Sequence, residues 1–451
     1  MAALAAVYFL TGKVGLTLAF VHPSATAVWP PAGIALTAFL ILGNRIWPSI
    51  FLAAFLVNIT TTGSVLVCLG IAAGNTLEGL AGAWLVNRYA GGRNAVYRTP
   101  DVFKFAFFAG LVCTTIAATF GVTSLTLGGF SSWSNDIAIW ATWWLGDGVS
   151  NVLIAPLLIM CISQPCLRWR QAQYFEASAL LVSIVMVGLL VFDGVFNLAT
   201  RNYPLEYLCI PFLLWAAYRF GRRESAAAML ILASMAIWGT LHGFGPFARE
   251  SNNESLLLLQ TFMGVVGVTT MGLATAFAER RAAEERTHLL AVSDPLTGLG
   301  NYRRLIDALE AEIRRSGRTN RPFVFLLMDL DGLKAINDQH GHLTGSRALC
   351  RLAEVLRLHS RGIDTAARYG GDEFALIVPE TGDARQIVRR ISARIANDGE
   401  FPPLSVSIGA ATFPEDGETV ERLLSAADLA LYKSKHHKQE SPSSPQKSHT
   451  G

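Results

Sequence analysis

Charged residues are scarce in this chain of 451 residues: Asp, Glu, Lys and Arg make up 16% and hydrophobic residues 51%. The net charge of +3 is too small to indicate nucleic-acid binding, so no nucleic-acid partner is expected. The six cysteines are scattered without a Cys-x-x-Cys pair, which favours free buried thiols over disulfides or zinc. No basic segment precedes the first apolar run, so residues 3–21 are interpreted as a membrane helix rather than a signal peptide.

Long apolar segments fill the chain up to Phe277, and charges become dense only after it. The segments cover residues 3–21, 31–43, 48–60, 65–87, 103–124, 137–161, 176–195, 205–218, 224–243 and 256–278. Several are shorter than the ~20 residues that a membrane-spanning helix needs. We therefore predict an all-α, multi-pass membrane domain of roughly eight to ten helices over residues 1–278.

Basic residues in the loops predict the orientation of this domain. They gather in every second loop, at Arg45, Arg88, Arg93, Arg98, Lys104, Arg168, Arg170, Arg219, Arg222 and Arg223. Arg201 and Arg249 are exceptions in the intervening loops. By the positive-inside rule, both ends of the domain face the cytoplasm, where nucleoside triphosphates are available to the second half of the chain.

A Gly-Gly pair followed by two acids marks the second half. The stretch from Arg361 to Phe374 contains Gly370-Gly371-Asp372-Glu373, with strand-like residues on both sides. This pattern predicts a hairpin turn in which the glycines allow positive φ and let a bulky anion approach the main chain. Acidic side chains at the tip of a hairpin are better placed to bind a metal and a charged substrate than to form part of a hydrophobic core.

A second acidic cluster follows the apolar run at residues 323–328, which is typical of a strand covered on both faces. The run ends in Asp329-Leu330-Asp331. Acids at the end of a buried strand are costly unless a cation neutralises them. Brought beside Asp372, Asp329 would complete an oxygen site suited to Mg²⁺.

Helices and strands alternate after Asp294. We predict helices at residues 301–315, 344–358, 385–396 and 419–434, and strands at 323–329, 364–369, 373–378 and 404–412. Alternation of this kind predicts an α/β domain over residues 294–439, with helices packed against a mixed sheet.

The second half resembles the GGDEF family of nucleotide cyclases, which make cyclic dinucleotides. Besides the two acidic clusters, the resemblance rests on Asp294-Pro295-Leu296-Thr297-Gly298-Leu299, Lys334, Asn337-Asp338, Gly341-His342 and Ser407-Ile408-Gly409. It implies a palm-like, ferredoxin-related nucleotidyl-cyclase fold and a diguanylate cyclase that condenses two GTP into cyclic di-GMP. In this reaction each 3′-hydroxyl attacks the α-phosphate of the other nucleotide, and two pyrophosphates leave.

The resemblance also implies roles for individual residues. Mg²⁺ or Mn²⁺ would be held by Asp329, Asp372 and the carbonyl of Leu330, with Glu373 as a metal-site or general-base candidate. Lys334 and Lys435 would contact phosphates, Gly370 and Gly371 would line the nucleotide site, and Asn337 would read the guanine edge. Because each half-site holds one nucleotide, activity would require a homodimer. Asp331 and Asp338 are interpreted as structural.

Ser346 departs from the family pattern, which usually has aspartate at this position. Aspartate accepts hydrogen bonds from guanine N1–H and its amino group, whereas serine tolerates adenine as well. A subset, the hybrid promiscuous cyclases, carries serine here and makes cyclic AMP-GMP, so ATP is an additional candidate substrate. Arg361 and Asp364 match the family's inhibitory site for product; the alternative is a surface ion pair.

The first half resembles the membrane-associated sensor domain 1 family. The resemblance rests on Val28-Trp29-Pro30-Pro31-Ala32-Gly33, Trp47-Pro48, Trp143-Trp144-Leu145-Gly146-Asp147 and Ala155-Pro156-Leu157. It implies a sensory domain with an unidentified ligand, embedded in the lipid of a bacterial inner membrane. Glu78 and Asp147 are intramembrane acids, which are functional candidates by default; hydrogen bonding between helices or a place near the interface is the equal alternative.

Residues 279–293 predict a helical signalling linker with i,i+4 charge pairs, interpreted as a stalk that pairs in a dimer rather than a solvated spacer. Residues 440–451 predict a disordered tail.

Two other functions compete with an active cyclase: a degenerate, nucleotide-binding signalling receptor, and a transporter with a regulatory domain. Intact Asp329, Asp372, Glu373 and Lys334 disfavour the first, and the lack of a paired broken-helix pattern disfavours the second.

Overall fold

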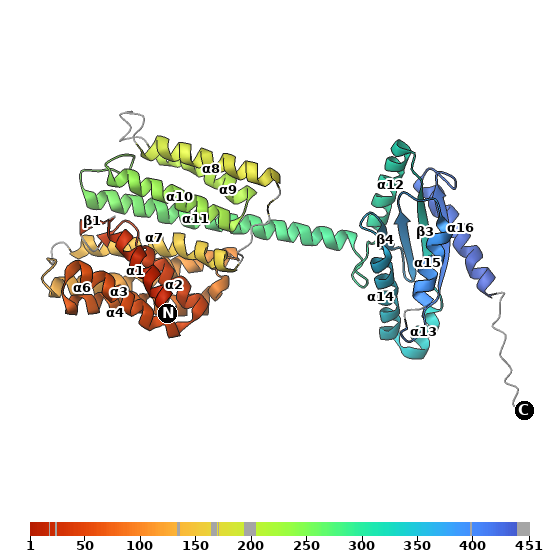
Figure 1. Cartoon of the computed structure of the whole chain (residues 1–451), viewed down its shortest axis with the longest axis horizontal. Helices are drawn as coiled ribbons and strands as arrows, with labels where there is room; N and C mark the ends of the chain where they lie inside the picture. Colours follow the sequence, from red (N-terminus) through yellow and green to blue (C-terminus); the bar gives the residue numbers. More distant parts are fainter. Residues whose placement is uncertain are drawn as a thin grey trace, which may run out of the picture. The chain divides into compact units, whose positions relative to one another are not determined.

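The computed structural model describes residues 1–17, 19–22, 25–132, 136–163, 169, 171–193, 204–396 and 399–439. The chain divides into two compact units, Met1–Ala282 and Ala283–Gly451, each described by itself (Figure 1). The predicted disordered tail lies outside the described residues.

The first unit is helical, apart from one short antiparallel pair of strands, β1 (Ala19–His22) and β2 (Ala25–Thr26). Its α-helices are α1 (Ala2–Thr17), α2 (Pro30–Leu42), α3 (Trp47–Thr62), α4 (Val65–Tyr89), α5 (Thr99–Phe105), α6 (Thr114–Leu127), α7 (Asp136–Ser163), α8 (Gln171–Phe192), α9 (Ile210–Arg219), α10 (Arg222–Leu241) and α11 (Asn252–Val292). Short 3₁₀ turns occur at η1 (Asn44–Ile46), η2 (Gly92–Asn94) and η4 (Leu205–Cys209), and η3 (Ala106–Val112) is a π-helix between α5 and α6.

Six helical segments among the described residues are long and apolar enough to cross a membrane. They are Val65–Tyr89, Thr99–Leu127, Asp136–Ser163, Gln171–Phe192, Arg222–Leu241 and Asn252–Thr287. The apolar helices α1 and α2 are shorter than such a span. The multi-pass helical character is therefore confirmed, while the larger helix count stays a prediction.

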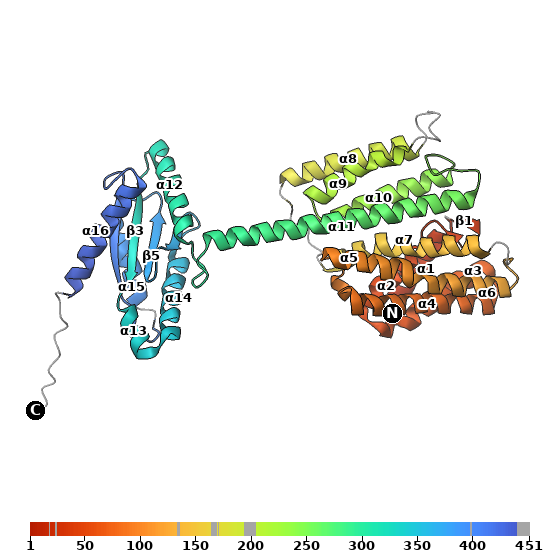
Figure 2. The ribbon, with the colours of Figure 1, turned by 180° about the vertical axis from the view of Figure 1, so that it is seen from behind.

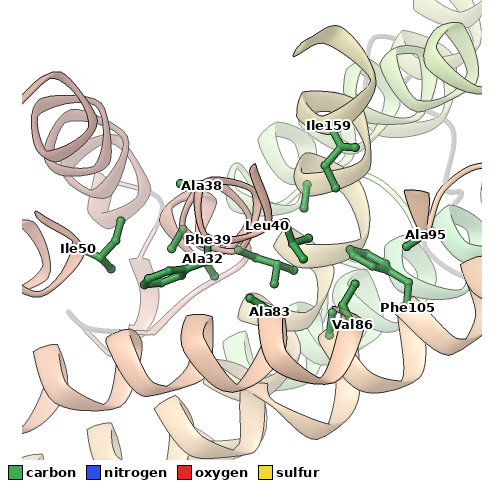
Figure 3. Packing of buried hydrophobic residues seen from close by; sticks show 14 of the residues in the cluster. Ala32, Ala38, Phe39, Leu40, Ile50, Ala83, Val86, Ala95, Phe105 and Ile159 are labelled. Carbon is green, nitrogen blue, oxygen red and sulfur yellow. The ribbon is translucent and has the colours of Figure 1, made fainter. Parts of the chain in front are cut away.

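Small residues let the helices of the first unit pack closely, as is common in membrane proteins. Figure 3 shows part of this core, with Phe39 of α2 near Ala83 of α4, and Val86 of α4 beside Phe105 of α5. A Cβ atom at Gly79 of α4 would lie only 2.6 Å from the Phe39 ring, so glycine at this position permits the contact between α2 and α4.

Helix α11 runs without a break from its apolar part into the charged segment that follows. The boundary between the two units falls within it, after Ala282. Of the predicted helical linker, residues 279–293, the structure has residues 279–292 in α11.

The second unit contains a four-stranded sheet of β3 (Phe323–Leu330), β4 (Thr365–Arg368), β5 (Glu373–Val378) and β6 (Val406–Phe413). The strand order is β4-β5-β3-β6, and every neighbouring pair is antiparallel. The prediction of a mixed sheet was therefore wrong. A hairpin joins β4 to β5, and β5 rather than β4 lies next to β3, so no parallel neighbours arise.

Helices cover both faces of this sheet: α12 (Tyr302–Thr319), α13 (Leu333–His340), α14 (His342–His359), α15 (Ala384–Ala396) and α16 (Val420–Gln439). One face of β3, with Val324 and Leu326, packs against α14 and α15. The other, with Phe323 and Phe325, packs against α12 and α16, and Figure 2 shows the sheet among these helices. This is the predicted palm-like arrangement, apart from α13, which the sequence did not predict.

Candidate active site

The two predicted acidic clusters meet at one end of the sheet. Asp329 on β3 is paired directly with Glu373 on β5, so their side chains lie on the same face. The next residue, Leu330, donates its backbone N–H to the carbonyl of Asp372 at 3.0 Å. Residues far apart in the sequence thus form one acidic site.

The electrostatics of this site favour a cation. Desolvation raises the pKa of Asp329, and the neighbouring charges of Asp372 and Asp331 raise it further, so the opposing effect of Lys435 is outweighed. Desolvation and the charges of Asp329 and Asp372 likewise raise the pKa of Glu373. Positive charge placed among these carboxyl groups would relieve their mutual repulsion.

Lys435 of α16 already supplies one positive charge. Its Nζ lies 2.6 Å from Oδ2 of Asp329, whose side chain is only 11% exposed. Desolvation lowers the pKa of Lys435, but the hydrogen bond to Asp329 and the fields of Asp372 and Glu373 outweigh it and raise the pKa. The predicted phosphate contact Lys435 therefore belongs to the site.

A glycine on the neighbouring strand positions α16. Leu423, Ala427 and Leu431 lie four residues apart on α16 and pack on the sheet, and Lys435 continues this spacing. A Cβ atom at Gly409 of β6 would overlap the carbonyl oxygen of Ala427 and the backbone nitrogen of Leu431. Only glycine lets the helix approach closely enough to bring Lys435 to Asp329.

The Gly-Gly turn differs in one respect from the prediction. A hairpin does form, with Tyr369 donating its N–H to the carbonyl of Glu373 at 2.8 Å. However, neither Gly370 nor Gly371 lies in the left-handed region, so positive φ is not the reason for these glycines. Instead, a Cβ atom at Gly371 would meet open space, which leaves the main chain accessible to an anion.

Arg368 holds this turn in place, and the sequence analysis did not single it out. Its guanidinium donates to the carbonyl of Gly371 at 2.6 and 3.1 Å and forms an ion pair with Asp294 at 3.2 Å. Burial alone would raise the pKa of Asp294, but hydrogen bonds from Thr297 and the charge of Arg368 lower it. The position of Arg368 two residues before Gly370 was the feature of the sequence that could have identified it.

Asp331 has structural contacts, in line with its predicted role. Its two carboxylate oxygens accept hydrogen bonds from the hydroxyl groups of Ser405 and Ser407, each at 2.6 Å. Its backbone N–H donates to the carbonyl of Ser405 at 2.9 Å. Asp331 thus joins the end of β3 to the start of β6.

The predicted base-reading residues lie together on two adjacent helices. Asn337 is on α13, and Ser346 is in the first turns of α14. A Cβ atom at Gly345 would lie 2.9 Å from Cγ of Asn337 and would overlap its Oδ1, so the Asn337 amide packs directly against the residue before Ser346. Both side chains are half-buried.

The remaining predicted residues are more exposed. Lys334 is exposed on α13. Arg361 and Asp364 share one turn, in which Oδ2 of Asp364 accepts the backbone N–H of Arg361 at 2.7 Å. This contact uses the main chain of Arg361 rather than its guanidinium, so the pair is not the simple surface ion pair of the alternative interpretation.

The predicted oxygen ligands for a divalent cation, the carboxylates of Asp329 and Asp372 and the carbonyl of Leu330, lie at the same end of the sheet. Within the described residues, no group of three or more His, Cys, Asp or Glu side chains is arranged as a metal site. Two carboxylates and a carbonyl fit a hard cation that keeps some of its water, such as Mg²⁺. The ammonium of Lys435 on Asp329 shows that this position accepts a positive charge.

Paired acids at a strand end, a lysine and an accessible Gly-Gly turn define a nucleotidyltransferase-type site. Comparisons with known proteins agree. The MASE1 family profile matches residues 1–281, and the profile described as diguanylate cyclase, GGDEF domain, matches residues 291–441. The chain therefore belongs to the MASE1 family and carries a GGDEF domain of the diguanylate cyclase type.

Named relatives match part of the chain. The bifunctional diguanylate cyclase/cyclic di-GMP phosphodiesterase MucR of Pseudomonas aeruginosa is 41% identical over 172 residues, which are 37% of this chain and 25% of MucR. Diguanylate cyclase DosC of Escherichia coli is 35% identical over 192 residues, 41% of each chain. A crystal structure of a sensory box/GGDEF family protein from Caulobacter crescentus is 36% identical, with a TM-score of 0.31, and the match covers 32% of this chain and 99% of that one. The chain thus spans less than half of MucR and DosC.

Proposed function

We propose that the protein is a membrane-bound sensory diguanylate cyclase that condenses two GTP into cyclic di-GMP and releases two pyrophosphates. The observation that carries the proposal is the grouping of three side chains around Asp329. The strand register pairs Asp329 with Glu373, and the ammonium of Lys435 on α16 lies 2.6 Å from Asp329. Acids and a lysine in this arrangement can hold a triphosphate and neutralise its charge.

Asp329 and Asp372, with the carbonyl of Leu330, would hold Mg²⁺ or Mn²⁺. Bound there, the cation would neutralise charge on the phosphate oxygens. The raised pKa of Glu373 makes it a better proton acceptor than an ordinary glutamate, in this case for the proton of the attacking 3′-hydroxyl. The ammonium of Lys435 would leave Asp329 and contact the phosphates. Lys334 would bind the triphosphate as well.

Asn337 and Ser346 would select the base. Serine can donate or accept a hydrogen bond, so Ser346 would discriminate poorly between guanine and adenine, and cyclic AMP-GMP is an expected second product. A purified full-length chain given equal ATP and GTP would reveal this choice. Cyclic di-GMP as the sole product would contradict relaxed base choice while leaving the cyclase proposal intact.

Each domain would hold one nucleotide, so two copies would have to meet for the reaction. Arg361 and Asp364, which share a turn before β4, would bind the product and slow turnover. The first unit, with its six candidate spans, would hold the protein in a bacterial inner membrane with the cyclase in the cytoplasm and would respond to a ligand.

The test measures pyrophosphate release by the full-length chain in lipid nanodiscs. Asp329→Asn and Asp372→Asn should each abolish release, since each removes a carboxylate from the site. Asp338→Asn is the matched control, because Asp338 is exposed on α13 and has no assigned catalytic role. GTP binding without pyrophosphate release by the unmodified chain would instead indicate a nucleotide-binding receptor.

A further inference from the structure

Two acids are buried against each other inside the helical unit. Glu78 on α4 and Asp147 on α7 are 3% and 0% exposed. Their carboxyl groups lie close enough to interact with each other. Either carboxyl group, when ionised, places a negative charge inside the helical unit.

No positive side chain neutralises that charge. Asn151 donates its amide to Glu78 at 3.1 Å and to the carbonyl of Ala109 at 2.8 Å. Neither carboxyl oxygen of Asp147 has a donor with the geometry of a hydrogen bond, although the Trp143 indole approaches it. Among the described residues, no Lys, Arg or His interacts with Glu78 or Asp147. A buried charge without a partner costs several kcal/mol, so Asp147 requires a further partner.

A small cavity lies directly beside Asp147. Its volume of about 10 Å³ has room for about one water-sized body. Asn75 and the indoles of Trp29 and Trp143 are part of its lining, whereas Glu78 is not. Asn75 is 7% exposed and its Oδ1 has no donor, while its amide nitrogen donates to the Tyr8 hydroxyl at 3.4 Å. The Trp29 indole N–H approaches the Tyr8 hydroxyl without the geometry of a hydrogen bond.

The cavity therefore combines unpartnered oxygens of Asp147 and Asn75 with aromatic walls. Carboxylate and amide oxygens are ligands for hard cations. Indole is the aromatic ring that attracts cations most strongly. The cavity volume of about 10 Å³ admits one small cation, and only without its hydration shell.

We propose that this cavity binds one small monovalent cation of the size of Na⁺, K⁺ or NH₄⁺, held by the Asp147 carboxylate and the Asn75 amide oxygen. Asn75 lies on α4 and Asp147 on α7, so the bound cation joins these two helices. The site gives the membrane unit a chemically defined ligand, and it does not depend on the cyclase activity of the second unit.

The test measures the unfolding temperature of the full-length chain in nanodiscs, at constant ionic strength, in chloride salts of Na⁺, K⁺, NH₄⁺ and N-methyl-D-glucamine. The large glucamine cation cannot enter the cavity. At least one small cation should raise the unfolding temperature saturably, by about 3 °C or more, over the glucamine salt. Asp147→Asn should abolish the difference, and it should be more stable than the unmodified chain in the glucamine salt because it removes a buried charge. Asn75→Leu should weaken the response.

Glu176→Gln is the matched control, because Glu176 pairs with Arg219 on the partly exposed side of α8 and does not line the cavity. It should keep the full cation response. The same unfolding temperature in all four salts would overturn the proposal, as would a response that survives in Asp147→Asn. A dependence on pH alone, without any dependence on the cation, would assign the pair a shared proton and also overturn it.

Discussion

Replacing Gly409 by alanine tests whether the close approach of α16 to β6 builds the catalytic site. The added Cβ would overlap backbone atoms of Ala427 and Leu431 and would lie 2.8 Å from Cβ of Leu431. A helix backbone cannot rotate away as a flexible side chain can, so α16 must move. Overpacking of this kind costs about 1–3 kcal/mol, which corresponds to a fall of about 2–12 °C in the unfolding temperature of a domain of this size.

Activity should fall more than stability alone explains. Lys435 lies one turn beyond Leu431, so a shift of α16 also displaces its ammonium from Asp329, 2.6 Å away. Misplacement by about 1 Å can reduce turnover roughly 10²-fold. The assay is pyrophosphate release by the full-length Gly409→Ala chain at a temperature where circular dichroism shows it folded.

Gly317→Ala is the matched control, because Gly317 lies in α12 and an added Cβ would meet no atom within 4 Å. Alanine there should keep full activity and raise stability by about 0.5–1 kcal/mol, since it lowers the entropy of the unfolded chain. If Gly409→Ala were as stable and as active as Gly317→Ala, the tight packing of α16 on β6 would not be what positions Lys435.

Four further substitutions test other parts of the site. Lys435→Met should reduce turnover roughly 10²-fold with the fold intact by circular dichroism, because it removes the positive charge beside Asp329. Asp294→Asn should remove a pH-dependent contribution to the free energy of unfolding. Because the pKa of Asp294 is lowered in the folded chain, this contribution is present above the ordinary Asp pKa of about 4 and is lost as the pH falls through the lowered pKa. Denaturant titration at several pH values measures it. Arg361→Ala should leave initial turnover unchanged but relieve inhibition by added product; unchanged inhibition would exclude the proposed regulatory site. Ser346→Asp should raise the preference for GTP over ATP roughly 10- to 150-fold in competition assays, because it restores a charge-assisted acceptor.

Much of the second unit could be predicted because its signals are local. The buried strand at β3 and the hairpin between β4 and β5 follow from apolar runs and turn residues, and their predicted bounds lie within one residue of the observed ones. Helix α13 was missed because it is only eight residues long, lies between Gly332 and Gly341, and lacks buried residues. The direction of neighbouring strands was also missed, since periodicity does not specify which strands become neighbours.

The first unit was less predictable because membrane helices are apolar on all sides. Composition identified the helices, but it did not predict the π-helical turn of η3 or which helices pack together. Glu78 and Asp147 could each be recognised as unusual from their surroundings in the sequence. Their contact depends on how α2, α6 and η3, which pack against both helices, bring α4 and α7 together, and no local pattern specifies this arrangement.

The contacts that matter most to the site join distant residues, and they suggest how a signal could reach it. Helix α11 ends at Val292, whose carbonyl accepts the N–H of Asn301 at 2.9 Å. The adjacent Gly300 exchanges hydrogen bonds with β4, and Asp294 holds Arg368, which in turn holds the carbonyl of Gly371. A rotation at the end of α11 would therefore act on the Gly-Gly turn through the ion pair of Asp294 with Arg368 and the hydrogen bonds from Arg368 to Gly371.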